Sequence, residues 1–336
     1  MSKAIFSSLF KLKIPIVGAP MAGVSGHALA AEVTKAGGLG FIAAGYMTDS
    51  KTLVGEIEQA KKSLNVGANE TQIPFGIGYI TFHLNSHPHL LLDVLKYQPK
   101  AIWFSFGDCR KWFTPIREQS PETRIFVQVQ SVAEAIVMAD HGADVIVSQG
   151  SESGGHGAKN NGSTLTLLPE IVDNLSGEVP VLAAGGIIDG RGIVAALSLG
   201  ADGVVLGTSL LASHESKLHP NFKQKVIATK DGGKSTIRTQ IFDQLRDIPW
   251  DLEVYDGRAL TNSVTCKFEQ LLTAAQAKEL QPDFQTAMTN GDPNIGVIFA
   301  GSGVGLVNSK KPAGQIVQGC HQEAIELLQK LSSSKL

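Results

Sequence analysis

The sequence predicts an α/β protein built as a closed (β/α)8 TIM barrel, with a smaller helical insertion after the eighth strand. Short apolar runs alternate with helical patterns, and runs this continuous are typical of strands buried on both faces. Repeated β-then-α units favour a closed barrel over an open sheet. No GxGxxG motif follows an early run, which disfavours a dinucleotide-binding fold. The predicted strands are Pro15–Pro20, Gly40–Ala44, Pro74–Gly78, Ala101–Ser105, Arg124–Gln128, Asp144–Ser148, Pro180–Ala184 and Gly203–Gly207.

The segments between these runs carry helix start and stop signals. Leu29–Ala36 is followed by Gly37–Gly38, a common helix stop. Ser131 and Glu134 have the spacing of a capping box, which predicts a helix that begins there. Asp189 is placed to cap the helix between the last two strands. Each predicted strand is therefore followed by a helix, as a barrel requires.

The alternation stops after Thr208, and this break divides the chain. Residues 1–212 and 295–336 are predicted to form the barrel and a final amphipathic helix, over about residues 313–331. Residues 213–294 show no further βα alternation and are predicted to form a helical insertion over or beside the barrel mouth. The glycine run Gly301–Gly305 is expected to form a tight turn.

Composition excludes several classes of protein. Of 336 residues, 43% are hydrophobic and 18% are charged, which is typical of a globular chain rather than a disordered one. The net charge of −2 gives no basic surface for nucleic acid. Cys109, Cys266 and Cys320 are far apart, so we expect no metal site and a reducing compartment. No apolar run reaches the roughly 18 residues of a membrane span, and we expect no membrane partner.

The last three residues, Ser334, Lys335 and Leu336, match a receptor-read peroxisomal address. If the organism is eukaryotic, we expect the peroxisomal import receptor to bind this tripeptide and the protein to be peroxisomal. The tripeptide has no such meaning in a bacterium, where we expect a cytoplasmic protein. A frayed polar tail after the last helix is the alternative interpretation.

The segment Gln149–Gly157, directly after the sixth predicted strand, is the strongest candidate for chemistry. It holds four glycines and one histidine, His156. Glycines let the backbone approach a ligand closely, and histidine is a common general base. In this fold the active site lies at the carboxyl ends of the strands, where this segment is placed. A glycine turn with a chance histidine is the alternative.

Two further observations indicate a ligand at the same end of the barrel. Gln128 and Gln130 share one face of the fifth strand, and an unpaired buried amide costs about 1–3 kcal/mol. A polar ligand would offset that cost, as would water at the rim. Gly185–Gly186 and Gly207–Thr208 end the last two strands, whose loops commonly bind phosphate. A phosphate site beside a histidine indicates a phosphorylated planar cofactor, and FMN fits best because no second nucleotide-binding fold is present.

These residues resemble the nitronate monooxygenases, formerly called 2-nitropropane dioxygenases. The resemblance implies non-covalent FMN and no metal. It implies oxidation of alkyl nitronates, and of neutral nitroalkanes, by O2 to a carbonyl compound and nitrite. The similar segments, taken in order, are Ala19–Ser25, Ala36–Phe41, Gln149–Gly157, Ala184–Ile187, Asp189–Arg191, Leu199–Thr208 and Arg258–Asn262.

The resemblance also implies roles for single residues. His156 would be the catalytic base for a neutral nitroalkane, and would polarise or position a substrate that arrives as a nitronate. Met21 would lie against the isoalloxazine and Gln128 near its polar edge. Together with Gly185 of the first phosphate loop, the residues expected to hold FMN are Gln149, Gly154, Gly186, Leu206, Gly207 and Thr208.

The chain departs from the family pattern at four positions. Gly78 stands where many members have asparagine, and Gln128 where some have lysine, which bears on the electrostatics at the flavin. Ser153 replaces a usual alanine, and Ser209 replaces a common arginine near the phosphate. None of these departures removes His156.

Two other functions stay open from the sequence. Enoyl-thioester and quinone reductases that use NAD(P)H resemble this family on the same FMN-dependent barrel. A non-catalytic FMN-binding protein is the alternative of another class, in which His156 would be dispensable. His27, His83, His87 and His89 are alternative bases, and we expect them at the surface or in loops.

Overall fold

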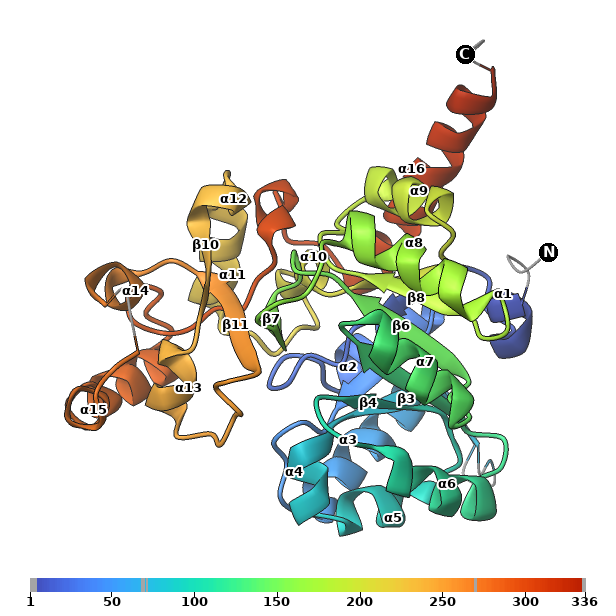
Figure 1. The fold of residues 1–336 in the computed structure, drawn as a ribbon, viewed down its shortest axis with the longest axis horizontal. Helices are drawn as coiled ribbons and strands as arrows, with labels where there is room; N and C mark the ends of the chain where they lie inside the picture. Colours follow the sequence, from blue (N-terminus) through green and yellow to red (C-terminus); the bar gives the residue numbers. More distant parts are fainter. Residues whose placement is uncertain (1–4, 68–69, 71, 269–270, 334–336) are drawn as a thin grey trace.

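The barrel predicted from the sequence is present in the computed structural model, which describes residues 5–67, 70, 72–268 and 271–333 (Figure 1). The parallel strands are neighbours in the order β1-β9-β8-β6-β5-β4-β3-β2. A parallel bridge between Val17 and Leu39 links the first strand to the segment before the second and so closes the ring. The strands are β1 (Ile16–Gly18), β2 (Phe41–Ala43), β3 (Ile73–Ile80), β4 (Pro99–Ser105), β5 (Arg124–Val129), β6 (Val145–Gln149), β8 (Val181–Ala184) and β9 (Gly203–Leu206).

Aromatic side chains fill the barrel toward the amino-terminal ends of its strands. Phe41, Trp103 and Phe126 pack in the lumen, with ring centroids 5.4 to 5.9 Å apart. The short helix α1 (Ile5–Phe10) brings Phe10 against Phe126 at 5.2 Å, and both rings are buried. Because the amino-terminal end of the barrel is plugged in this way, a ligand has room only at the carboxyl end of the strands.

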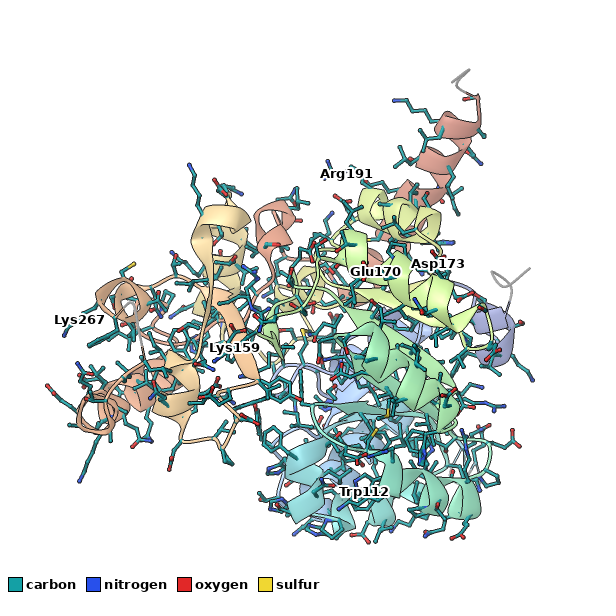
Figure 2. All side chains as sticks on the ribbon, in the orientation of Figure 1. Trp112, Lys159, Glu170, Asp173, Arg191 and Lys267 are labelled. Atoms are coloured by element: carbon teal, nitrogen blue, oxygen red, sulfur yellow. The ribbon has the colours of Figure 1, made fainter. Side chains whose placement is uncertain are left out.

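Helices surround the barrel, and their polar side chains face outward, as Glu170, Asp173 and Arg191 do in Figure 2. The Asp189 side chain caps its helix as predicted. Ser131 also caps its helix as predicted. The Glu134 carboxylate, however, accepts a hydrogen bond from the backbone N–H of Gln130 at 2.7 Å, rather than from that of Ser131 as in a capping box. The helices that follow the strands are α2 (His27–Lys35), α3 (Ser50–Ser63), α4 (Thr81–Ser86), α5 (His89–Leu95), η1 (Arg110–Trp112), α6 (Phe113–Gln119), α7 (Val132–Asp140), α8 (Thr164–Leu175), α9 (Gly190–Ser198), α10 (Thr208–Leu211) and the C-terminal α16 (Ala313–Ser333).

The inserted segment contains the expected helices, but the helical interpretation left out two strands. β10 (Thr236–Thr239) and β11 (Tyr255–Leu260) form an antiparallel sheet with β7 (Gly155–Ala158), a strand that was not predicted from the sequence and that overlaps the end of the glycine-rich segment. The sheet joins the insertion to the barrel (Figure 1). The helices of the insertion are α11 (Pro220–Ala228), α12 (Gly232–Ser235), α13 (Ile241–Arg246), α14 (Ser263–Lys267) and α15 (Ala274–Asn290).

The return from the insertion to the barrel passes through η2 (Ser302–Leu306), which includes most of the glycine run expected to turn. The final helix begins at Ala313 as predicted and packs against α9 and α2. No helix in the described part of the chain is long and apolar enough to cross a membrane. The C-terminal tripeptide Ser334–Leu336 lies outside the described residues, so its targeting role stays a prediction.

Candidate active site

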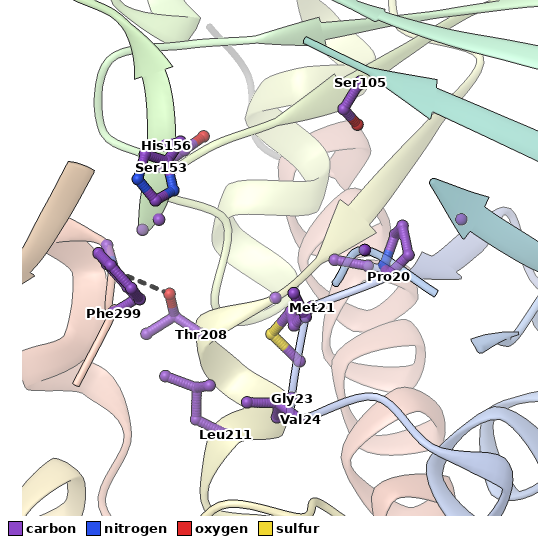
Figure 3. Close-up of a pocket in the computed structure, with 18 of the residues that line it drawn as sticks. Pro20, Met21, Gly23, Val24, Ser105, Ser153, His156, Thr208, Leu211 and Phe299 are labelled. Atoms are coloured by element: carbon purple, nitrogen blue, oxygen red, sulfur yellow. Dashed lines mark hydrogen bonds between the residues drawn. The ribbon is translucent and has the colours of Figure 1, made fainter. Parts of the chain in front are cut away.

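A cavity of about 650 Å³ lies at the carboxyl ends of the strands, between the barrel and the insertion. This volume is within the roughly 300–1,000 Å³ usual for cofactor and substrate sites. His156 and Phe299 lie on one side of it, and Met21 and Pro20, from the loop after β1, lie across from them (Figure 3). The predicted site residues that line this cavity are Met21, Gln128, Gln149, Gly154, His156, Gly185, Gly186, Gly207 and Thr208.

Leu206 is the one predicted site residue that does not line the cavity. Its side chain is fully buried in the barrel core, while its carbonyl oxygen accepts from the Ala19 amide at 2.9 Å. Leu206 can therefore contact a cofactor only through its backbone, and this role stays a prediction.

The paired loops after β8 and β9 have the backbone expected of an anion site. Gly185 and Gly186 both have positive φ, at 117° and 72°, a region that favours glycine. Within the described part of the chain, the Gly186 amide has no protein acceptor. The Thr208 hydroxyl accepts from the Gly301 amide at 2.9 Å, so it also fixes the return segment beside the cavity. The Gly186 amide is therefore left as a donor for a phosphate.

Gln128 and Gln130 have a protein partner, contrary to the argument that a ligand is needed to satisfy them. Their amide nitrogens donate to Gln149 Oε1 at 2.9 and 2.7 Å. Gln149 in turn donates to the His156 carbonyl at 3.0 Å. The sequence could not show this pairing because it joins strands β5 and β6 to β7. The side-chain amides of these three glutamines position β7, and Gln128 and Gln149 also line the cavity.

Two glycines allow close packing around the cavity. A Cβ on Gly154 would lie 2.5 Å from the Ala300 carbonyl carbon, so only glycine allows the two backbones to approach this closely. A Cβ on Gly78 would lie 2.3 Å from the Pro20 ring. In this structure the Pro20 ring thus occupies the space where a side chain at position 78 would begin.

His156 is held on the cavity wall by residues of the insertion. It lies in β7, opposite Gly257 of β11, and is only 8% exposed. Its Nε2 lies 2.7 Å from Asp243 Oδ1 in α13, and Asp243 is 2% exposed. The Trp250 ring stacks on the imidazole with centroids 3.7 Å apart and planes at 6°. Because a carboxylate only accepts, Nε2 carries the proton and the Nδ1 lone pair is left for a substrate.

Sequence reasoning did not identify Asp243 or Trp250. The signal in the sequence was weak: Asp243 is a carboxylate among the apolar residues of Ile241–Leu245. In the structure, every residue of this segment is buried except Gln244. A charge at a core position of a short helix indicates a buried partner. Nothing in the sequence showed that the partner is His156.

The other candidate bases are accounted for elsewhere. His27 Nδ1 lies 3.0 Å from Glu56 Oε2, and His83 Nε2 lies 2.7 Å from the Met47 carbonyl. None of the four alternative histidines lines the cavity. Among the described residues, no group of three or more His, Cys, Asp or Glu side chains could hold a metal ion.

Comparisons with known proteins identify the family of this chain. The family model described as nitronate monooxygenase matches residues 3–323. A nitronate monooxygenase from Neurospora crassa is 35% identical, over 95% of this chain and 91% of that protein. Among solved structures, FabK from Thermotoga maritima has a TM-score of 0.80 and 29% identity over 97% of both chains.

A nitroalkane oxidase from Streptomyces ansochromogenes also has a TM-score of 0.80, with 26% identity over 97% of this chain and 100% of that one. These neighbours share the barrel as well as the insertion, since the matches span nearly the whole chain. The family match covers the strands, the glycine loops and the histidine segment described above. The chain belongs to the nitronate monooxygenase family of flavin-dependent oxidoreductases.

Proposed function

We propose that this enzyme uses FMN and O2 to oxidise alkyl nitronates to a carbonyl compound and nitrite, and accepts neutral nitroalkanes through proton abstraction by His156. The observation that carries the proposal is the buried imidazole on the cavity wall, with Nε2 bonded to Asp243 and Nδ1 without a protein partner among the described residues. A histidine with one nitrogen bonded to a carboxylate and the other without a partner has the geometry of a general base.

The residues around the cavity fit FMN. The amide of Gly186 offers a donor for its phosphate, and the volume suits a cofactor with a small substrate. Met21 and Gln128 line the wall where the ring system would lie. When bound, FMN supplies a one-electron acceptor beside the substrate, and O2 completes the oxidation.

The protein's own part is to bind the substrate, exclude water and move one proton. Nδ1 of His156 takes the α-proton of a neutral nitroalkane, which leaves the nitronate anion. The Asp243 carboxylate then faces an imidazolium at 2.7 Å and stabilises the charge that develops. The Trp250 ring prevents the imidazole from tilting. A substrate that enters as a nitronate omits the proton step and uses His156 only for positioning.

The test is nitrite formation by wild type and by His156→Asn, with nitroethane and with preformed ethyl nitronate. Wild type should carry FMN and release nitrite from both. The variant should keep its flavin and the nitronate reaction but lose most turnover of nitroethane, about 100-fold or more for a general base. A wild-type protein that releases no nitrite from either substrate would overturn the proposal.

The likeness to FabK makes a nicotinamide-dependent reductase the second candidate. Anaerobic titration separates the two. Flavin bleached by NADH but unaffected by ethyl nitronate would favour the reductase. A wild-type flavin that responds to the nitronate alone would favour the monooxygenase.

We further propose peroxisomal import in a eukaryotic cell, supported by the Ser334–Leu336 tripeptide. An amino-terminal fluorescent fusion should co-localise with a peroxisomal marker. Removal of the tripeptide should leave the fusion diffuse, and unchanged localisation would contradict the proposal.

A further inference from the structure

We infer that Arg246 is the anion-binding residue of the substrate pocket, where its guanidinium holds the planar two-oxygen head of the nitronate. The inference rests on the proposed function and adds a determinant of substrate choice. Arg246 lies in α13, one helical turn after Asp243, and lines the same cavity as His156. One short helix thus carries both the partner of the base and a cation.

The guanidinium is held by two aromatic rings. Its central carbon lies 4.8 Å from the ring centroid of Tyr46 and 5.7 Å from that of Phe299. The Phe299 ring is also 5.1 Å from the His156 ring, so the cation and the imidazole contact the same side chain. An arginine stacked on rings loses little further freedom when it binds a ligand.

No carboxylate lies within ion-pair distance of Arg246 in the described part of the chain. Other arginines at this end of the molecule are paired, as Arg238 is with Asp256 and Arg191 with Asp189. The nearest acidic group on the same helix, Asp243, is bonded to His156. The charge of Arg246 therefore remains available to a ligand in the cavity.

Tyr46 does not neutralise this charge. Its hydroxyl accepts from Trp250 Nε1 at 3.0 Å, and burial raises the pKa of the phenol although Arg246 opposes that rise. Tyr46 is thus a neutral hydroxyl at working pH. The half-buried guanidinium lies against two neutral rings, where an ion pair is screened less than at the surface.

The chemistry of the ligand follows from the shape of the donor. Guanidinium presents paired N–H donors in one plane, which match two oxygens on a planar anion. A nitronate has this shape and charge, whereas a neutral nitroalkane has the oxygens without the net charge. Arg246 therefore favours the nitronate on binding. With a nitroalkane it stabilises the anion that forms as His156 removes the proton.

Nitrate is a suitable probe because it is planar, anionic and unreactive. Its dissociation constant is measured on the FMN-loaded enzyme from the change in flavin absorbance, for wild type, Arg246→Met and Arg246→Lys. Losing a charge-assisted hydrogen bond should weaken nitrate binding and raise KM for ethyl nitronate by about 10- to 100-fold in the methionine variant. Lysine keeps the charge but not the paired donors, so its affinity should lie between the two.

Arg110→Met is the matched control, because Arg110 is exposed, pairs with Asp108 and does not line the cavity. It should bind nitrate like wild type. Arg246→Met that binds nitrate as tightly as wild type, or wild type that binds none, would overturn the inference. Nitrate binding involves no turnover. A wild type that binds nitrate through Arg246 but releases no nitrite would therefore reject the proposed function while the anion site stands.

Discussion

Replacing Asp243 should separate the base function of His156 from the rest of the reaction. Asp243→Ala removes the carboxylate oxygen that lies 2.7 Å from Nε2 and accepts its hydrogen bond, so the imidazole is free to carry its hydrogen on Nδ1 instead. A hydrogen bond to a charged group contributes about 1.5–3 kcal/mol. Both partners are buried, so little of this is lost to solvent. The corresponding loss in kcat/KM for nitroethane is about 10- to 150-fold.

The assay compares nitroethane with ethyl nitronate in the same preparations. Only nitroethane needs a base, so nitronate turnover should stay close to wild type, and an α-deuterium isotope effect on nitroethane should grow. Asp243→Asn keeps an oxygen acceptor and should lose less than alanine. Equal losses on both substrates would refute the reasoning, because they would show that Asp243 supports the fold rather than the proton transfer.

One further prediction tests the packing around the site, and another tests the burial of two cysteines. Gly154→Ala should lower the free energy of unfolding by about 1–3 kcal/mol, because its Cβ would lie 2.5 Å from the Ala300 backbone. Gly55→Ala, in an open helical position, should instead stabilise by up to about 1 kcal/mol; thermal unfolding compares the two, and equal effects would contradict the packing argument. Burial raises the pKa of the Cys109 thiol to about 12 and that of Cys320 to about 11, so both are neutral thiols at pH 8. The folded protein should react with a disulfide reagent at the exposed Cys266 alone, and reaction of more than one thiol before unfolding would contradict this.

The barrel could be predicted because its signals are local. Strands buried on both faces must be apolar at every position, as in Val145–Val147, and such runs stand out against the helices between them. The strands of the insertion have no such pattern. Thr236–Thr239 alternates a single isoleucine with polar residues, and its sheet depends on pairing with distant segments.

The site was likewise predictable only where its residues are tied to the ends of the strands. Gly185–Gly186 follow β8, Gly207–Thr208 follow β9 and His156 follows β6. Because each is tied to its strand, their meeting at one end of the barrel follows from chain order. Gln128 and Gln130 illustrate the limit. Their type and place indicated a ligand, but both side chains donate to Gln149 Oε1, a partner that the strand pattern could not reveal.

By itself, the sequence determined the barrel and the end of it at which the glycine loops and His156 meet, because periodicity and chain order act over short distances. Only the tertiary structure decided what that histidine can do. Asp243 is 87 residues away along the chain, and it reaches His156 because β11 pairs with β7 and carries the insertion against the cavity. The partner of an imidazole sets which nitrogen keeps the proton, and that partner is chosen by long-range packing.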